Sequence, residues 1–241
     1  NDYARALKIP RDNVREAAKV VLKNQTIKMD IGKAADSYFI NIAAAGTLTE
    51  LTYSVPSQLK TTFGYLAYVV KGAELLPQVK FRPVRVKHDK GVFEGKVSMI
   101  FVALTNSIGG FEQIVPDAKL DDGKFTLIMV KTGNLFEILH LLRLVLDGGK
   151  HIEHKHVEYL KTEKLSIEAA EGSTDRLLLN LDGEYGGDAP VKLLNLANHI
   201  EFFADTDKIA SHAITIDTET FRLEEMAKLF AEEVTHLEDN I

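Results

Sequence analysis

The fold is decided by the stretch TIKMDIGKAADSYFINIAAAG, residues 26–46. Within it Ile27, Met29 and Ile31 alternate with more polar residues. Alternation with a period of two is typical of a strand that buries one face. The apolar run over residues 38–44 indicates a second strand, which contains several small residues. This stretch therefore begins a β-rich region.

Two short helices are predicted upstream of this stretch. The first covers residues 1–9 and ends before Pro10, because proline cannot continue a helix. The second covers residues 11–23, with Asp12 as its cap. Its apolar face is expected to contain Val14, Ala17, Ala18, Val21 and Leu22. The change from helical to strand spacing places a domain boundary near Gln25.

Downstream, the pattern is mainly that of strands. These are predicted over residues 79–88, 92–104, 125–130, 157–162, 164–169, 176–181 and 199–204, many of them separated by turns. Helices are predicted over residues 57–76 and 134–146. The tail differs, because residues 220–237 repeat apolar side chains at helical spacing and predict an amphipathic helix.

Composition excludes several classes of protein. The net charge of −6 does not suggest a broad nucleic-acid surface. The absence of cysteine excludes disulfides and thiolate metal sites, and it fits a reducing cytoplasm. No apolar run approaches the ~18 residues that a membrane span needs. The opening residues NDYARAL carry no initiating Met and read like the interior of a longer protein, so we expect a truncated chain.

Three acidic spots are candidates for chemistry. Asp2 is either a functional carboxylate or a helix cap. The run VPDAKLDDGKF, residues 115–125, has three carboxylates that could hold a divalent cation, but on local grounds an Asp-Gly turn with solvated charges explains it better. The run LNLDGEYGG, residues 179–187, places an acid at the end of an apolar strand, where it could act as a general base. A hairpin turn is the alternative there.

Two other features are interpreted as structural. The run HIEHKH, residues 151–156, has histidines but no further metal ligand close in sequence, so we expect a solvated loop rather than a zinc site. Lys71 could meet a phosphate, although it fits a solvated position on the predicted helix better.

Taken in order, these stretches resemble the diacylglycerol kinase catalytic domain, and among its members the soluble Gram-positive enzymes. Residues 1–7 resemble that family's Gly-Thr-x-Asn-Asp-x-x-Arg-x-Leu element, starting after its Gly-Thr. The other matching runs are MDIG at 29–32, YFIN at 38–41, AAAG at 43–46, NS at 106–107, GF at 110–111, residues 116–125 and LDGE at 181–184. The resemblance extends over residues 1–204. The family's Gly-Gly-Asp-Gly-Thr phosphate loop is absent from this sequence.

The resemblance implies an α+β fold with a cleft between two domains. Residues 1–25 would be the remnant of an α/β nucleotide-binding domain, and residues 26–205 a β-rich sandwich domain. Residues 206–241 would form a tail with an amphipathic helix. Because the phosphate loop is absent, we expect this chain alone to bind ATP poorly and to be inactive.

The resemblance also implies roles for particular residues. Asn1 and Asp2 would lie beside the nucleotide phosphates, with Asp2 as an essential catalytic carboxylate close to magnesium. Glu184 would be the general base that takes the proton from the lipid hydroxyl. Lys119, Asp122 and Lys124 would form a structural magnesium loop, with Asp122 giving its carboxylate and the two lysines their backbone. Relatives often have serine at position 119.

The implied reaction transfers the γ-phosphate of ATP to diacylglycerol and gives phosphatidic acid, with Mg²⁺ as cofactor. A related kinase acting on a sphingoid base or phosphatidylglycerol is one alternative, and a non-catalytic lipid-binding sandwich module is another. We expect a cytoplasmic protein that visits the inner face of the membrane as a peripheral protein, without a nucleic-acid partner. A homodimer is also expected, because a sandwich has exposed strand edges.

Overall fold

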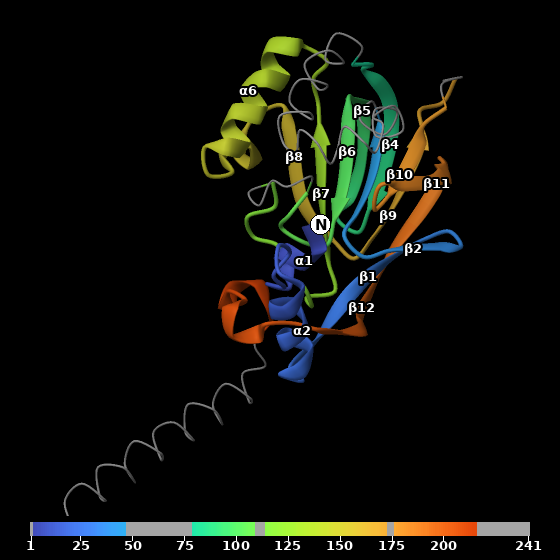
Figure 1. Cartoon of the computed structure of the whole chain (residues 1–241). Coiled ribbons are helices and arrows are strands. Elements are labelled where there is room, and N and C mark those ends of the chain that lie inside the picture. Colours follow the sequence, from blue (N-terminus) through green and yellow to red (C-terminus); the bar gives the residue numbers. More distant parts are fainter. Residues whose placement is uncertain (1, 47–78, 109–113, 173–175, 216–241) are drawn as a thin grey trace, which may run out of the picture.

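Two six-stranded antiparallel sheets form the body of the protein (Figure 1). The structure is a computed structural model that describes residues 2–46, 79–108, 114–172 and 176–215. Sheet A contains, in spatial order, β2 (Ser37–Phe39), β1 (Thr26–Ala34), β12 (Val191–Phe203), β9 (Lys164–Ala169), β4 (Arg82–His88) and β5 (Gly91–Val97). Sheet B contains β11 (Glu184–Asp188), β10 (Leu178–Leu181), β3 (Ile42–Gly46), β6 (Met99–Ala103), β7 (Phe125–Val130) and β8 (Val157–Thr162). The predicted β-rich sandwich is confirmed.

The main core lies between the two sheets, where alternate residues of each strand point inward. The rings of Phe39 from sheet A and Phe125 from sheet B stack with their centroids 5.6 Å apart. Sheet B is also covered on its outer side by α6 (Leu135–Leu146), whose Ile138 and Leu141 pack against Ile128 of β7. Every residue of β7 is consequently buried, although a strand covered on one face buries only alternate residues.

The chain crosses from one sheet to the other at two short links. Residues Ile40 and Asn41 separate β2 of sheet A from β3 of sheet B, and Ser98 separates β5 of sheet A from β6 of sheet B. The predictions of single strands over residues 38–44 and 92–104 were therefore wrong at these links. Apolar residues lie on both sides of Asn41 and of Ser98, so the sequence pattern gives no sign that the partner sheet has changed.

The second predicted helix exists, but its predicted cap and apolar face are wrong. In α2 (Val14–Leu22) the side chain of Asn13, not Asp12, accepts hydrogen bonds from the backbone N–H groups of Arg15 and Glu16. Val14 is 86% exposed and Leu22 is 82% exposed, whereas Val20 is buried. The helix touches the rest of the described chain through the side that carries Val20, roughly opposite to the predicted face.

The last two strands also differ from the prediction. The strand predicted over residues 199–204 is the end of β12, which begins at Val191. β11 was not predicted at all, because its residues EYGGD include two glycines and an aspartate, which are poor strand formers.

The helices predicted over residues 57–76 and 220–237 lie outside the described residues. In the described part of the chain, no helix is long and apolar enough to cross a membrane.

Gly32 in β1 is required by the ring of Phe39, which lies across it. The two residues are paired in the β1–β2 ladder, and a Cβ atom built on Gly32 would lie 2.1 Å from the Phe39 ring. We expect Gly32→Ala to displace this buried ring and to lower the free energy of unfolding by about 1–3 kcal/mol, as overpacking does. Urea unfolding would measure the change. The double variant Gly32→Ala/Phe39→Leu should recover part of the loss, and a Gly32→Ala protein as stable as the parent would contradict this account.

Candidate active site

Asp2 is the first residue of α1 (Asp2–Ala6), a short helix that packs directly on the sandwich. Tyr3, Ala6 and Leu7 are buried in a cluster that also contains Ile27, Met29, Leu120, Ala204 and Ile209. The Tyr3 hydroxyl donates to the sulfur of Met29 at 3.4 Å, and its ring meets Phe202 edge-on at 5.0 Å. These contacts hold α1, and with it Asp2, in a fixed place on sheet A.

The carboxylate of Asp2 reaches across to sheet B. Its Oδ1 atom accepts hydrogen bonds from the guanidinium of Arg5 at 3.0 Å and from the hydroxyl of Ser107 at 2.8 Å. The Asp2 side chain is 22% exposed, so the carboxylate is accessible as well as positioned. Ser107 is fully buried and follows β6, which links the helix to the central part of sheet B.

A hydrogen-bond network continues from Ser107 to the β10–β11 hairpin. The Ser107 carbonyl accepts from Nδ2 of Asn41 at 3.2 Å, and Thr105 donates to Oδ1 of the same asparagine. The backbone N–H of Asn41 then donates to Asp182 at 2.9 Å. We call these residues, Asp2, Asn41, Thr105, Ser107 and Asp182, the Asp2–Asp182 network. This network joins Asp2 to the run over residues 179–187, two acidic candidates that are far apart in the sequence.

The carboxylate of Asp182 accepts hydrogen bonds from backbone N–H groups where the chain crosses from sheet A to sheet B. Its Oδ2 atom accepts from the N–H of Ile40 at 2.6 Å, and its Oδ1 atom accepts from the N–H groups of Asn41 and Ile42 at 2.9 and 2.8 Å. Asp182 and Gly183 both have positive φ, at 52° and 102°, as a two-residue hairpin turn requires. The burial of Tyr3, with the charge of Asp182 as a smaller cause, raises the pKa of the Tyr3 phenol well above its usual value.

Glu184 begins β11, immediately after this turn. It is paired with Leu181 of β10 and is exposed. Directly opposed residues of an antiparallel pair point to the same side of the sheet. Leu181 is buried in the main core, so Glu184 projects at the hairpin end of the sandwich on the inner side of sheet B. The interpretation of residues 179–187 as a hairpin turn was right, and it is compatible with a role for Glu184.

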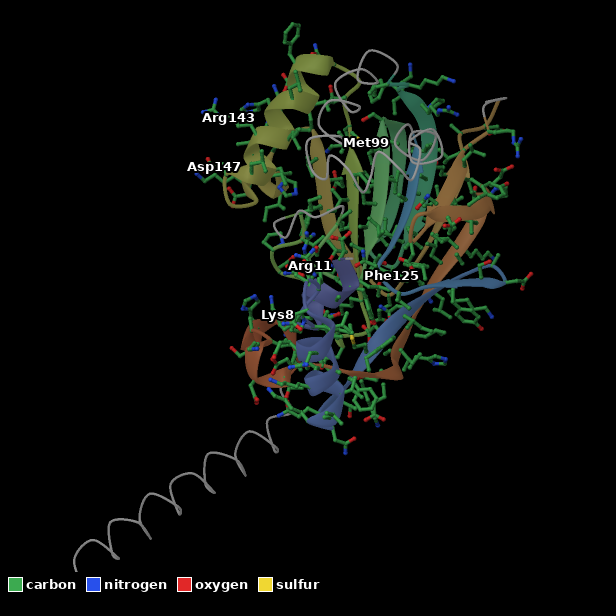
Figure 2. All side chains as sticks on the ribbon, viewed as in Figure 1. Lys8, Arg11, Met99, Phe125, Arg143 and Asp147 are labelled. Atoms are coloured by element: carbon green, nitrogen blue, oxygen red, sulfur yellow. The ribbon has the colours of Figure 1, made fainter. Side chains whose placement is uncertain are left out.

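A small hollow borders α1 at Ala6 and the segment after β6 at Asn106. It is lined by Lys8, Asn106, Pro116, Leu120 and His212, among others. Figure 2 shows Lys8 beside the C-terminal segment that contributes His212 to this hollow. Asn106 directly precedes Ser107, so this hollow places a lysine and a histidine close to the network.

The loop over residues 119–124 is fastened by a buried carboxylate that was not predicted. Asp30 of β1 is 1% exposed and accepts from the N–H groups of Gly123 at 2.6 Å and Asn198 at 2.9 Å. Asn198 lies where β12 bulges away from β1. Within the loop, Oδ1 of Asp122 accepts from the N–H of Lys124 at 3.0 Å, which closes a tight turn.

Three carboxylates, Asp30, Asp121 and Asp122, interact at this loop, which also carries Lys119. Burial raises the pKa of Asp30 above its usual value, and burial likewise raises the pKa of Asp121; the charge of Asp122 adds to both shifts. A bound cation would relieve this repulsion. However, no group of three His, Cys, Asp or Glu side chains with the arrangement of a metal site occurs among the residues that the structure describes. A divalent ion here would rely on Asp122, backbone carbonyls and water, which is a ligand set that Mg²⁺ accepts.

The histidine run is only partly the solvated loop that was predicted. His151 is 4% exposed, and its Nε2 atom lies 3.1 Å from the Ile114 carbonyl oxygen. Burial lowers the pKa of His151. His154 and His156 lie near Glu137 of α6, each with Nε2 4.0 Å from the same carboxylate oxygen.

Sequence reasoning missed the residues that hold the candidate site together. Asn41, Ser107 and Asp30 lie inside the runs that resemble the family motifs, but no role was predicted for them. Asp182 was seen only as a neighbour of Glu184. Their positions relative to Asp2 depend on strand pairing, which single-sequence patterns do not give. Asn1 lies outside the described residues.

Residues 44–204 match the family model of the YegS C-terminal NAD kinase beta sandwich-like domain. The chain belongs to this family. It is 46% identical to the diacylglycerol kinase of Staphylococcus aureus strain bovine RF122 / ET3-1 over 217 residues, which are 90% of this chain and 67% of that protein. The diacylglycerol kinase of the Newman strain matches with the same identity and coverage. The chain thus spans about two thirds of the length of these curated relatives.

Solved structures share the fold of this family member. A crystal structure from Bacillus anthracis str. Sterne aligns with a TM-score of 0.68 and 22% identity, covering 86% of this chain and 66% of that one. A diacylglycerol kinase structure from the same organism aligns with a TM-score of 0.59 and 19% identity, covering 86% and 64%. These alignments support the sandwich architecture.

The Asp182 carboxylate should contribute strongly to stability. Asp182→Asn keeps one acceptor oxygen but turns the other group into a donor that faces backbone N–H groups. We expect a loss of about 1–3 kcal/mol in the free energy of unfolding, the range that is typical of hydrogen bonds to a charged group. Urea unfolding would measure this loss, and hydrogen exchange at Ile40, Asn41 and Ile42 should become faster. Asp36→Asn, in the exposed β1–β2 turn, is the control. Equal stability of the two variants would contradict the assignment.

Proposed function

We propose that this chain provides the acceptor side of an ATP-dependent lipid kinase that phosphorylates diacylglycerol to phosphatidic acid. The observation that carries the proposal is its 46% identity to diacylglycerol kinases over 90% of the chain. The geometry supports it independently, because the Asp2–Asp182 network brings Asp2 into one connected site with the hairpin that carries Glu184.

In the proposed reaction Glu184 takes the proton from the free hydroxyl of diacylglycerol. The hydroxyl oxygen then bonds to the γ-phosphorus of ATP, while the bond from that phosphorus to the bridging oxygen breaks and ADP leaves. Glu184 suits this role because it is exposed on a paired strand, so the carboxylate is accessible and its backbone is held. Asp2 and Arg5 would lie at the phosphates, where Arg5 offers a positive charge to an anionic donor.

Magnesium is the proposed cofactor. Bound to the phosphates it would neutralise part of their charge, which a site rich in carboxylates needs. Asp2 is the residue of this chain proposed to lie near that ion. Asp122, with the backbone of Lys119 and Lys124, is proposed to hold a separate structural ion, in keeping with the crowding of Asp30, Asp121 and Asp122.

The wider setting is also a proposal. Diacylglycerol resides in a bilayer, so the protein would act in the cytoplasm and visit the inner face of the membrane as a peripheral protein. A homodimer remains a prediction. Assays with diacylglycerol, a sphingoid base and phosphatidylglycerol as acceptors would identify the lipid. These assays require a polypeptide that also contains the remaining part of the relatives, about a third of their length, which this chain does not span.

Glu184→Gln should abolish most of the turnover in such a polypeptide. The amide keeps the size and hydrogen bonding of the side chain but cannot accept the proton. Removal of a general base typically lowers the rate by about 10² to 10⁴-fold, so we expect a loss of that order with little change in ATP affinity. Steady-state kinetics with a short-chain diacylglycerol would measure both.

The matched control for this variant is Glu168→Gln. It removes a surface ion pair with Lys87 on sheet A. It should leave turnover unchanged. A Glu184→Gln enzyme within threefold of the parent would place the base elsewhere, and absence of turnover by the parent with every acceptor would favour the non-catalytic module.

Magnesium should stabilise the fold through Asp122. Saturation at about 100 times Kd adds about 2.7 kcal/mol, which is about 5–10 °C in melting temperature for a chain of this size. We expect this shift between magnesium and chelator in the parent and in Asp36→Ala, but not in Asp122→Ala, which removes the proposed anionic ligand. Differential scanning calorimetry would measure it. The same shift in all three proteins would exclude the structural ion.

A further inference from the structure

Four of the eight histidines of the chain lie between residues 140 and 156. His140 belongs to α6, His151 lies in the short 3-10 helix η2 (Lys150–Glu153), and His154 and His156 lie in the link from η2 to β8. Helix α6 packs on the outer face of sheet B, and the chain returns through η2 to β8 at the edge of that sheet (Figure 1). We call residues 135–156 the α6 corner.

Three imidazole rings of the α6 corner lie against one another. The ring centroids of His140 and His154 are 5.4 Å apart, and those of His154 and His156 are 5.5 Å apart. The side chain of His154, in the middle, is 17% exposed. Protonation of two neighbouring rings would therefore place like charges side by side, where solvent screens them only in part.

One carboxylate of α6 faces two of these rings. The Oε2 atom of Glu137 lies 4.0 Å from Nε2 of His154 and also 4.0 Å from Nε2 of His156. Both distances are too long for a hydrogen bond, so neither ring is held by the carboxylate while it is neutral. A single negative charge balances one protonated ring but not two or three.

The surroundings of His154 consequently favour its neutral form. Burial is the largest cause that lowers the pKa of His154, and it outweighs the charge of Glu137, which raises that pKa. The charges of His156, His140 and Lys155 lower it further.

The ion pairs next to the rings do not change this balance. Asp147 pairs with Lys150 at 2.9 Å at the end of α6, and Lys131 pairs with Glu158 of β8 at 2.8 Å. Each of these pairs is neutral as a whole, so Glu137 is the carboxylate on which protonated rings would depend.

His151 is kept neutral by a different contact. It is 4% exposed, and its Nε2 atom lies 3.1 Å from the carbonyl oxygen of Ile114. A carbonyl oxygen can only accept, so Nε2 carries the proton of the neutral ring. The Nδ1 atom is buried and makes no hydrogen bond in the described part of the chain. Burial lowers the pKa of His151, and the carbonyls of Ile114 and Gly149 oppose this only in part.

We propose that the α6 corner is an acid-sensitive latch, which holds α6 on sheet B while its histidines are neutral and loosens when they are protonated. A second proton on the His151 ring would enter a buried place without a hydrogen-bond acceptor, which favours exit of the ring. Exit of His151 would also free the Ile114 carbonyl, and with it the segment that leads toward residues 119–124. This inference does not depend on the proposed lipid kinase activity.

The pH range of the latch follows from the direction of the two shifts. Histidine has an ordinary pKa of 6.5, and His151 and His154 both have lower values in the folded chain. As the pH falls, a form in which these side chains are released takes up protons before the closed form does. The contribution of the latch to stability is therefore complete above this ordinary value and is lost as the pH falls below it.

Amide hydrogen exchange of the chain at two pH values would measure the latch. The probes are the amides of Ile138 and Asp147, which donate to Asn134 and Arg143 within or at the end of α6. After correction for intrinsic exchange, their protection should fall at least about tenfold between about pH 7.5 and about pH 5.5. The amides of β6, in the middle of sheet B, are the internal reference and should keep their protection.

Replacement of the two histidines should remove most of this loss. In His151→Gln/His154→Gln the glutamine at 151 keeps an N–H group that can donate to Ile114, but neither glutamine titrates. The protection of α6 should then differ by less than about threefold between the two pH values. His199→Gln, which changes an exposed histidine on β12, is the matched control and should behave like the parent.

Glu137→Gln tests the charge balance without altering a histidine. The amide no longer balances a protonated ring, so the ratio of α6 protection between the two pH values should become at least about threefold larger than in the parent. Any loss of helix stability that is the same at both pH values cancels in this ratio. This variant and the single variant His154→Gln, whose loss should be smaller than that of the parent, also decide the question if the double variant does not fold.

Three results would overturn the latch. One is a parent protein in which the protection of α6 changes with pH no more than that of β6. Another is an equal acid loss in the parent and in the histidine variants, because acid would then act elsewhere in the chain. The third is a Glu137→Gln ratio equal to that of the parent, which would mean that the charge of the rings does not open the corner.

Discussion

The carboxylate of Asp182 satisfies three backbone N–H groups where the chain leaves sheet A and enters sheet B. A chain that crosses between sheets leaves its ladder, so its backbone donors need other partners. Asp182 supplies them from the β10–β11 hairpin of sheet B. This fixes Asn41, and Asn41 in turn fixes Ser107, to which Asp2 is bonded. One carboxylate at one crossing thus links the hairpin to Asp2, whose own helix is held by packing on sheet A.

Asp30 likewise accepts backbone N–H groups at a second place where regular strand pairing is interrupted. It is buried in β1 and accepts N–H groups from the bulge of β12 and from the turn at Gly123. The cost of burying this charge, visible in the raised pKa of Asp30, is offset in part by those hydrogen bonds. Both acceptors therefore act where regular pairing fails, and each lies next to a loop with proposed chemistry. The regular part of the sandwich needs no such residues, because its strands pair with one another.

The sequence was most informative where periodicity reports burial directly. Strand β7 and helix α6 were predicted closely, since the spacing of their apolar residues is a local signal. The break at Ser98 was not visible, because strand spacing continues while the partner sheet changes. The exposed side of α2 was misassigned for a similar reason: apolar spacing marks a side of a helix but not what covers it. For the site, the acidic runs were found, whereas the network between them depends on pairings that only the three-dimensional structure supplies.

Asp182 and Glu184 are two residues apart, yet their surroundings suit them to opposite tasks. Both oxygens of Asp182 accept backbone hydrogen bonds. Such a carboxylate is a good anchor for the crossing chain. Glu184 is exposed and lies past the turn, on a strand whose position Asp182 helps to hold. The difference lies in hydrogen bonding, because Asp182 is held by backbone donors, and it lets one short hairpin carry both an anchor and the carboxylate that we propose as the base.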